Sequence, residues 1–131
     1  MKLEFLDATG DGEFPDANPK YLVRISEYTD QELFLLVEQI ENFILSPQIP
    51  IALHRLPFVQ PINCLVTFAL SNEDDGLEKL NGENEFLCNL TLSGYKQMVE
   101  ILNLNTDFHN WLTPGEYYDD PAFLISKYGP W

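Results

Sequence analysis

Residues 29–45, TDQELFLLVEQIENFIL, are the stretch of sequence that decides the fold. Thr29 can accept a hydrogen bond from the backbone N–H of Glu32, and the Glu32 side chain can reach back to the N–H of Thr29. This reciprocal pattern is a capping box, and Asp30 and Glu32 also place negative charge at the positive end of the helix dipole. The stretch therefore predicts an α-helix whose N-cap is Thr29.

Apolar side chains recur along this helix at steps of three and four residues. They are Leu33, Leu36, Val37, Ile40, Phe43 and Ile44. A stripe with this spacing is the face that a helix buries in a protein core. Phe34, Leu35 and Leu45 widen the stripe, so we expect the helix to be covered on more than one side. Pro47 cannot continue a helix, which predicts an end at about Leu45.

Strands are predicted before this helix. Residues 2–6 predict a short strand, and residues 21–27 predict a second strand with one buried face, because their apolar side chains alternate. The two faces of the second strand would carry Tyr21, Val23 and Ile25 on one side and Leu22, Arg24 and Ser26 on the other.

The chain after the helix also predicts strands. Residues 63–70, NCLVTFAL, are nearly all apolar, which is typical of a central strand. Residues 85–92, EFLCNLTL, alternate as in a strand with one face on the core. The stretch between them is acidic and contains two glycines, so we expect an antiparallel pair joined by a long hairpin loop. An edge strand is expected near residues 51–53 and a last strand at residues 123–126.

A second helix is predicted at residues 94–103, with Ser93 as its N-cap. Its buried stripe would consist of Tyr95, Met98, Val99 and Leu102. Residues 105–121 are polar, aromatic and rich in turn residues, so we expect a loop there. We therefore predict a single α+β domain over residues 1–131, in which two helices pack on one face of a mainly antiparallel sheet.

Charge is the most distinctive bulk property of the chain. Its 131 residues include 21 acidic and 7 basic ones, which gives a formal net charge of −14 at pH 7. Such a balance repels phosphate backbones and anionic lipid surfaces, so we expect neither nucleic acid nor a membrane as a partner. A basic protein partner or a cation is compatible with it, and so is high solubility alone. The 45% hydrophobic content is enough for a packed core.

No cofactor or metal motif is complete in the sequence. There is no glycine-rich phosphate loop of either common type. Residues 7–13 resemble the first half of a calcium loop, but Asn18 stands where such a loop has a bidentate glutamate. An Asx or glycine turn explains the same pattern, so we predict no metal and no cofactor.

The cysteines and the N-terminal residues indicate a reducing compartment. Cys64 and Cys88 are the two cysteines, they lie in apolar strand-like runs, and they form neither a zinc motif nor a disulfide framework. Residues 1–14 contain no apolar segment of the length that a signal peptide needs. We therefore expect a cytoplasmic protein.

Two segments combine the residue types that protein interfaces use. The first is an acidic loop with Glu73, Asp74 and Asp75. The second is a stretch of acids and aromatics with Trp111, Glu116, Tyr117, Tyr118, Asp119 and Asp120. Aromatic side chains supply contact area and neighbouring acids supply charge selectivity, so these residues are the candidate partner-binding residues. The alternatives are a solvated loop tip for the first segment and a lid that closes the core for the second.

Catalytic groups are less evident. His109 lies near Asp107, His54 lies in a proline-rich stretch, and Cys88 lies in an apolar strand where a thiolate would not be favoured. The sequence therefore favours a small interaction domain that engages a basic protein. In size and charge it is similar to bacterial immunity proteins that block a basic toxin, although no motif is shared.

Two other hypotheses stay open. The chain can be a small-molecule or metal-binding domain, or a hydrolase, with a pocket between the helices and the sheet. It can also be a subunit of a homo-oligomer whose interface includes apolar side chains left partly exposed on the monomer. Those side chains would be Phe34, Leu35, Leu45, Phe58 and Val59.

Overall fold

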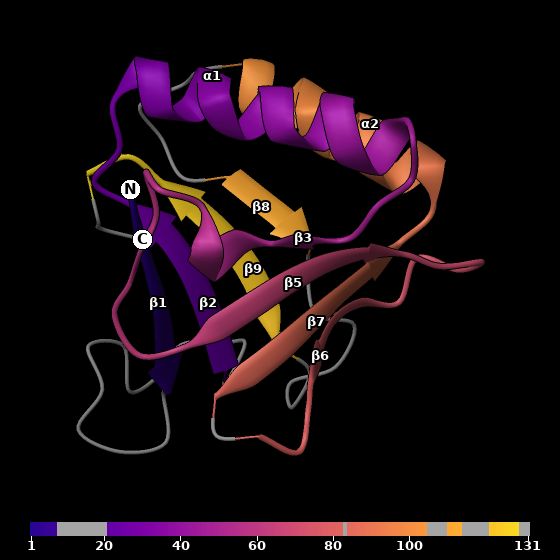
Figure 1. Ribbon diagram of the computed structural model, residues 1–131. Coiled ribbons are helices and arrows are strands. Elements are labelled where there is room, and N and C mark those ends of the chain that lie inside the picture. Colours follow the sequence, from indigo (N-terminus) through magenta and orange to yellow (C-terminus); the bar gives the residue numbers. More distant parts are fainter. Residues whose placement is uncertain (8–20, 83, 105–109, 114–120, 129–131) are drawn as a thin grey trace.

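The computed structural model describes residues 1–7, 21–82, 84–104, 110–113 and 121–128, which form two β-sheets and two α-helices (Figure 1). The first sheet contains β1 (Lys2–Asp7), β2 (Tyr21–Ser26), β4 (Gln60–Pro61), β8 (Asn110–Thr113) and β9 (Ala122–Ser126), in the order β4-β1-β2-β9-β8. The second sheet contains β3 (Ile51–Ala52), β5 (Leu65–Leu70), β6 (Gly76–Lys79) and β7 (Glu85–Leu90), in the order β3-β5-β7-β6.

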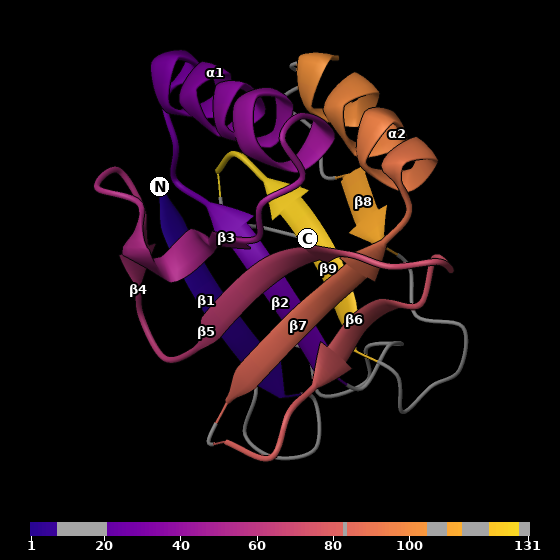
Figure 2. The ribbon, with the colours of Figure 1, turned by 45° about the vertical axis from the view of Figure 1, so that its right-hand side comes forward.

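The two sheets face each other, and the helices lie across one end of them. The helical elements are α1 (Asp30–Gln39), the π-helical turn η1 (Ile40–Leu45), the 3-10 turn η2 (Leu53–Arg55) and α2 (Leu92–Asn103). Figures 1 and 2 show α1 and α2 side by side above the sheets. Buried side chains of both sheets and both helices form one core, which includes Leu3, Ile25, Leu36, Phe68, Phe86 and Met98.

The prediction of a mixed α+β fold is confirmed, but the pairing of the strands differs from the prediction. Both sheets are mixed rather than mainly antiparallel, since β2 pairs with β9 in parallel and β5 pairs with β7 in parallel. The predicted antiparallel pairing of β5 and β7 is wrong. The long connection between them contains β6, which runs back and pairs antiparallel with the far side of β7, so that β7 lies between β5 and β6.

Two more local expectations are corrected. Residues 110–113 form β8 on the edge of the first sheet, within the stretch that was expected to be a loop. The strand β2 is buried on both faces rather than on one. Its outer face carries a second small apolar cluster of Leu22, Ala122 and Leu124, against which Leu6 and Trp111 pack. On the same strand, the buried Arg24 forms an ion pair with Glu4 at 3.1 Å.

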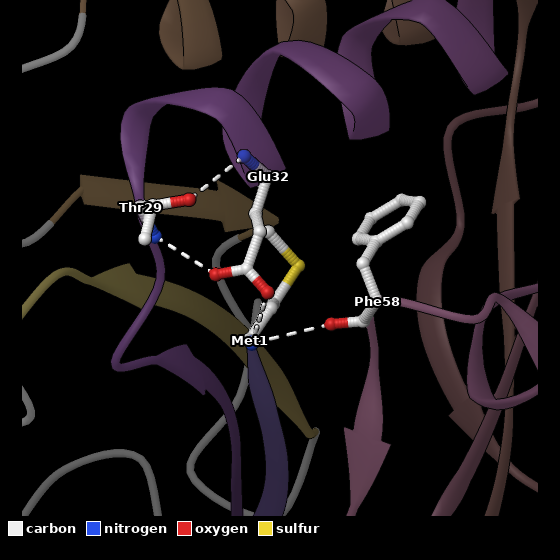
Figure 3. Close-up of polar contacts among 4 residues, drawn as sticks. All are labelled: Met1, Thr29, Glu32 and Phe58. Atoms are coloured by element: carbon white, nitrogen blue, oxygen red, sulfur yellow. Dashed lines mark hydrogen bonds and ion pairs between the residues drawn. The ribbon is translucent and has the colours of Figure 1, made fainter.

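The capping box of α1 is confirmed. Glu32 N donates to Thr29 Oγ1 at 3.1 Å, and Thr29 N donates to Glu32 Oε1 at 2.9 Å (Figure 3). The helical stretch also ends at Leu45 as predicted, but its last part is the π-helical turn η1. The wider turn changes the spacing of the buried face, which explains why Ile40 and Ile44 are fully buried whereas Phe43, expected in the stripe, is 41% exposed.

Glu32 has a second role, because it also binds the α-amino group of Met1. The Met1 ammonium donates to Glu32 Oε2 at 2.9 Å and to the carbonyl oxygen of Phe58 at 3.2 Å (Figure 3). The backbone carbonyl of Met1 accepts from Gln60 N at 2.7 Å, which begins the pairing of β1 with β4. One carboxylate therefore joins the start of α1 to the start of the first sheet.

The second helix is held at both its N-cap and its buried face. Its N-cap is Thr91, whose hydroxyl accepts from Gly94 N at 3.0 Å, so the predicted cap at Ser93 is two residues too late. Tyr95 is fully buried, and its hydroxyl lies 2.8 Å from the carbonyl oxygens of Ala69 and Cys88. This hydroxyl attaches α2 to both central strands of the second sheet.

A pair of alanine substitutions tests the helix face. We expect Ile40→Ala to lower the free energy of unfolding by about 2–5 kcal/mol, because it leaves a cavity in the core. Phe43→Ala, three residues on, should cost about 1 kcal/mol or less, since that side chain is largely at the surface. Denaturant unfolding measures both. Equal losses for the two variants would contradict the π-helical arrangement.

The Glu32 contacts predict a specific dependence of stability on pH. The hydrogen bond from the Met1 ammonium, with that from Thr29 N–H, holds the pKa of Glu32 below its ordinary value. Such a carboxylate stabilises the fold above its unfolded pKa and loses this contribution as the pH falls through its folded pKa. We expect Glu32→Gln to be less stable than the wild type at neutral pH, and the difference to vanish in acid. Glu38→Gln on the exposed side of α1 is the control, and it should show little difference from the wild type at either pH.

Candidate functional site

A cavity of about 700 Å³ lies where β6, α2 and β8 meet, and we call it the edge groove. Figure 2 shows these three elements on the same side of the molecule. One wall consists of Asp74, Asp75, Gly76, Leu77, Glu78 and Lys79, from β6 and the loop before it. The second wall consists of Leu90, the last residue of β7, and of Gly94, Gln97, Met98 and Ile101 of α2. The third wall consists of Trp111, Leu112 and Thr113 of β8 and of Pro121.

The groove lies between two edge strands, one from each sheet, which approach each other at one point. β6 is the last strand of the second sheet and β8 is the last strand of the first. At Gly76, where φ is +77°, an added Cβ would lie 3.7 Å from the Cβ of Thr113. Glycine suits this backbone conformation because it has no steric penalty at positive φ. Beyond this contact the two strands are separated by the groove.

A bulge in β8 shapes the wall opposite β6. The register of β8 with β9 shifts between Trp111 and Thr113, so that Leu112 and Thr113 are both buried although they are neighbours in the chain. Bulges of this kind change the direction of side chains at sheet edges. The buried Thr113 hydroxyl has no hydrogen-bond partner among the residues that the structure describes, so its hydrogen-bonding capacity is unmet there.

The groove has an apolar floor and an acidic rim. Leu77, Leu90, Met98 and Leu112 are buried and belong to the main core, and Ile101 is half-buried against it. Trp111 is also half-buried, but it packs against the outer cluster of Leu22, Ala122 and Leu124. The side chains of Asp75 and Glu78 are exposed at the rim, and so is that of Lys79. Among the described lining residues the rim therefore carries more negative than positive charge, in a chain whose net charge is −14.

Asp74 differs from the other rim carboxylates because the fold itself uses it. Its Oδ1 accepts from Thr91 N at 2.8 Å and from Thr91 Oγ1 at 2.9 Å. Thr91 is in turn the N-cap of α2, so Asp74 ties the loop before β6 to the first turn of this helix. An added Cβ at Gly94 would collide with Asp74 Oδ1, so a larger residue at this position would displace the carboxylate from Thr91.

The structure brings three of the predicted partner-binding residues to one place. Asp74, Asp75 and Trp111 line the edge groove, whereas Glu73 is exposed in the loop and is not among the lining residues. The remaining predicted residues lie outside the described residues; they are Glu116, Tyr117, Tyr118, Asp119 and Asp120. Sequence reasoning did not propose Glu78 and Thr113 as binding residues. The sequence of β6, Gly-Leu-Glu-Lys, is a weak strand signal because glycine, glutamate and lysine are depleted in strands.

The residues that the sequence offered for catalysis either have structural roles, as His54, Cys64 and Cys88 do, or lie outside the described residues. His54 Nδ1 lies 3.2 Å from Val66 N, which lets it accept from the backbone of β5 just beyond the pairing with β3. Burial raises the pKa of both Cys64 and Cys88 to about 12, so these thiols stay protonated at neutral pH. His109, Asp107 and the calcium-like turn after Asp7 lie outside the described residues. Among the described residues, no group of three His, Cys, Asp or Glu is placed to hold a metal ion.

The two other hypotheses can now be placed on the structure. The pocket between helix and sheet that a small-molecule site would need is the edge groove itself. Of the apolar residues suggested for an oligomer interface, Phe34 is 63% exposed, whereas Val59 is buried and the prediction for it is wrong. Leu35, Leu45 and Phe58 are half-buried.

Comparison of the chain with protein-family models, with curated proteins and with solved structures finds no match. Within the described part of the chain, neither α-helix has the length and apolar character needed to cross a membrane.

Substitution of the two neighbouring rim carboxylates should change the stability of the protein by different amounts. We expect Asp74→Ala to lower the free energy of unfolding by about 1–2 kcal/mol, because Thr91 loses two hydrogen bonds to a charged acceptor. Asp75→Ala should change it by about 0.5 kcal/mol or less, since both carboxylates are exposed but Asp74 is the one that accepts from Thr91. Thermal or denaturant unfolding measures both variants. A loss for Asp75→Ala as large as that for Asp74→Ala would contradict this assignment of roles.

Proposed function

We propose that this protein is an interaction domain that binds a cationic segment of a basic protein partner in the edge groove. The observation that carries the proposal is the composition of this one cavity. Exposed carboxylates of Asp75 and Glu78 lie beside an apolar floor to which β6, β7, α2 and β8 contribute from distant parts of the sequence. Carboxylates beside an apolar surface are suited to recognise lysine and arginine.

The chemistry of a basic side chain matches both parts of the groove. Lysine and arginine can lay their apolar stems along hydrophobic surface while the charged head stays near water and near an anion. In the edge groove, Met98 and Ile101 offer such a surface, and Asp75 and Glu78 offer the anions at its rim. Trp111 borders the cavity from β8 and packs against the small apolar cluster on the outer face of the first sheet.

The charge of the whole chain supports the same choice of partner. A net charge of −14 attracts a basic protein over a long range and accelerates the encounter at low ionic strength. The same charge repels nucleic acids and anionic lipids. The similarity in size and charge to bacterial immunity proteins agrees with a basic protein as the target, but it is an analogy without a shared motif.

Charge reversal at the groove tests the proposal against a matched control. The groove variant carries Asp75→Lys and Glu78→Lys, and the control carries Glu38→Lys and Glu41→Lys on the exposed side of α1 and η1. Both variants change the net charge equally. A basic protein captured from a lysate of the source cells at low salt is purified and titrated against the wild type and both variants.

We expect the groove variant to bind this protein at least about tenfold more weakly than the control, because a like charge at the contact costs more than one at a distance. Raising the salt should weaken the wild-type complex. Equal affinities of the two variants would show that net charge, and not the groove, attracts the partner. The absence of any basic protein that binds the wild type would overturn the proposal.

A further inference from the structure

We infer that the partner segment binds as an additional β-strand along the free edge of β6, with basic and apolar side chains in alternation. This inference rests on the proposed function and specifies the form of the ligand. In the part of the chain that the structure describes, β6 pairs with β7 on one side and with no strand on the other. The edge groove lies on that open side.

The direction of the free backbone groups follows from the register of β6 with β7. Leu80 N donates to the carbonyl of Glu85 at 2.7 Å, which makes these two residues a hydrogen-bonded pair. Hydrogen-bonded and non-hydrogen-bonded pairs alternate along an antiparallel ladder. Glu78, opposite Leu87, therefore bonds to β7, whereas the N–H and C=O groups of Leu77 and Lys79 point away from it.

The other sheet edges are less suited to receive a strand. β3 and β4 have two residues each, and one residue of β4 is Pro61, which has no N–H to offer. The ladder of β8 is irregular, because its register with β9 shifts between Trp111 and Thr113. β6 is thus the edge that combines outward backbone groups with an adjoining cavity, which is the arrangement that strand addition uses for affinity and specificity.

Neighbouring side chains on β6 specify the pattern of the added strand. Residues directly opposite each other on paired strands share a face, and opposite charges there are favourable. A basic residue therefore fits opposite Glu78. An apolar residue fits opposite Leu77, beside the floor of the groove, and a basic residue is disfavoured opposite the exposed Lys79. The preferred ligand is an extended segment in which basic and apolar residues alternate.

Two substitutions at one position separate strand addition from charge attraction. Lys79→Ala and Lys79→Pro remove the same positive charge, but the proline also removes an N–H that points away from β7. Proline is tolerated on an edge strand when its missing N–H faces outward. The probe is a short synthetic peptide of alternating lysine and valine, and the control peptide has the same composition with its lysines grouped at one end.

We expect Lys79→Ala to bind the alternating peptide at least as tightly as the wild type, because the rim becomes more acidic. Lys79→Pro should bind it about tenfold more weakly, since a hydrogen bond is lost and a peptide carbonyl is left without its donor. Equal affinities of the two variants would overturn strand addition.

Hydrogen exchange on the wild-type protein gives a readout that does not depend on the folding of a variant. The amides of Leu77 and Lys79 should exchange readily in the free protein and become protected when the alternating peptide binds. The amides of Glu78 and Leu80, which bond to β7, should be protected in both states. Binding without new protection at Leu77 and Lys79 would overturn strand addition.

The outcomes for this inference and for the proposed function are distinguishable. Binding of both peptides with equal affinity, sensitive to Asp75→Lys and Glu78→Lys, would leave the groove as a cation-binding surface and overturn the added strand. Binding of neither peptide, together with equal affinities of the two charge-reversal variants for the captured protein, would overturn both.

Discussion

The pairing of Asp74 with Thr91 is the interaction on which the shape of the edge groove depends. Asp74 belongs to the loop before β6, and Thr91 caps α2, so two hydrogen bonds join the edge of the second sheet to the helix above it. The absence of a side chain at Gly94 leaves room for the Asp74 carboxylate, and glycine at position 76 allows the positive φ with which β6 begins beside Thr113. A carboxylate and two glycines therefore shape the start of β6 beside α2 and β8.

The elements that depend on local chemistry could be predicted from the sequence. The capping box at Thr29 and Glu32 involves residues three apart, and the strands near residues 65–70 and 85–90 carry their signals in their own side chains. The pairing of these strands could not be predicted, because it depends on β6, whose four residues include two charged ones. The same holds for β2, on whose outer face Leu22 packs with Ala122 and Leu124 of β9, a strand far away in the sequence.

The candidate site was predictable in its residue types and not in its geometry. Acids near residue 74 and an aromatic side chain at residue 111 were each recognised as interface chemistry, but their meeting at one cavity depends on the placement of two sheet edges. Two neighbours in the acidic loop also have different roles. Asp74 is bound to the cap of α2, and Asp75 is exposed at the rim, which a count of charges does not distinguish.

The most direct measurement is a map of backbone amide chemical shifts as the purified basic partner is added to the labelled protein. If the edge groove is the binding surface, the largest changes will fall at residues 74–79, along the side of α2 that carries Gly94 and Met98, and at residues 111–113. Changes centred instead on the exposed side of α1 around Phe34 would contradict this site and indicate that the partner binds to the helices.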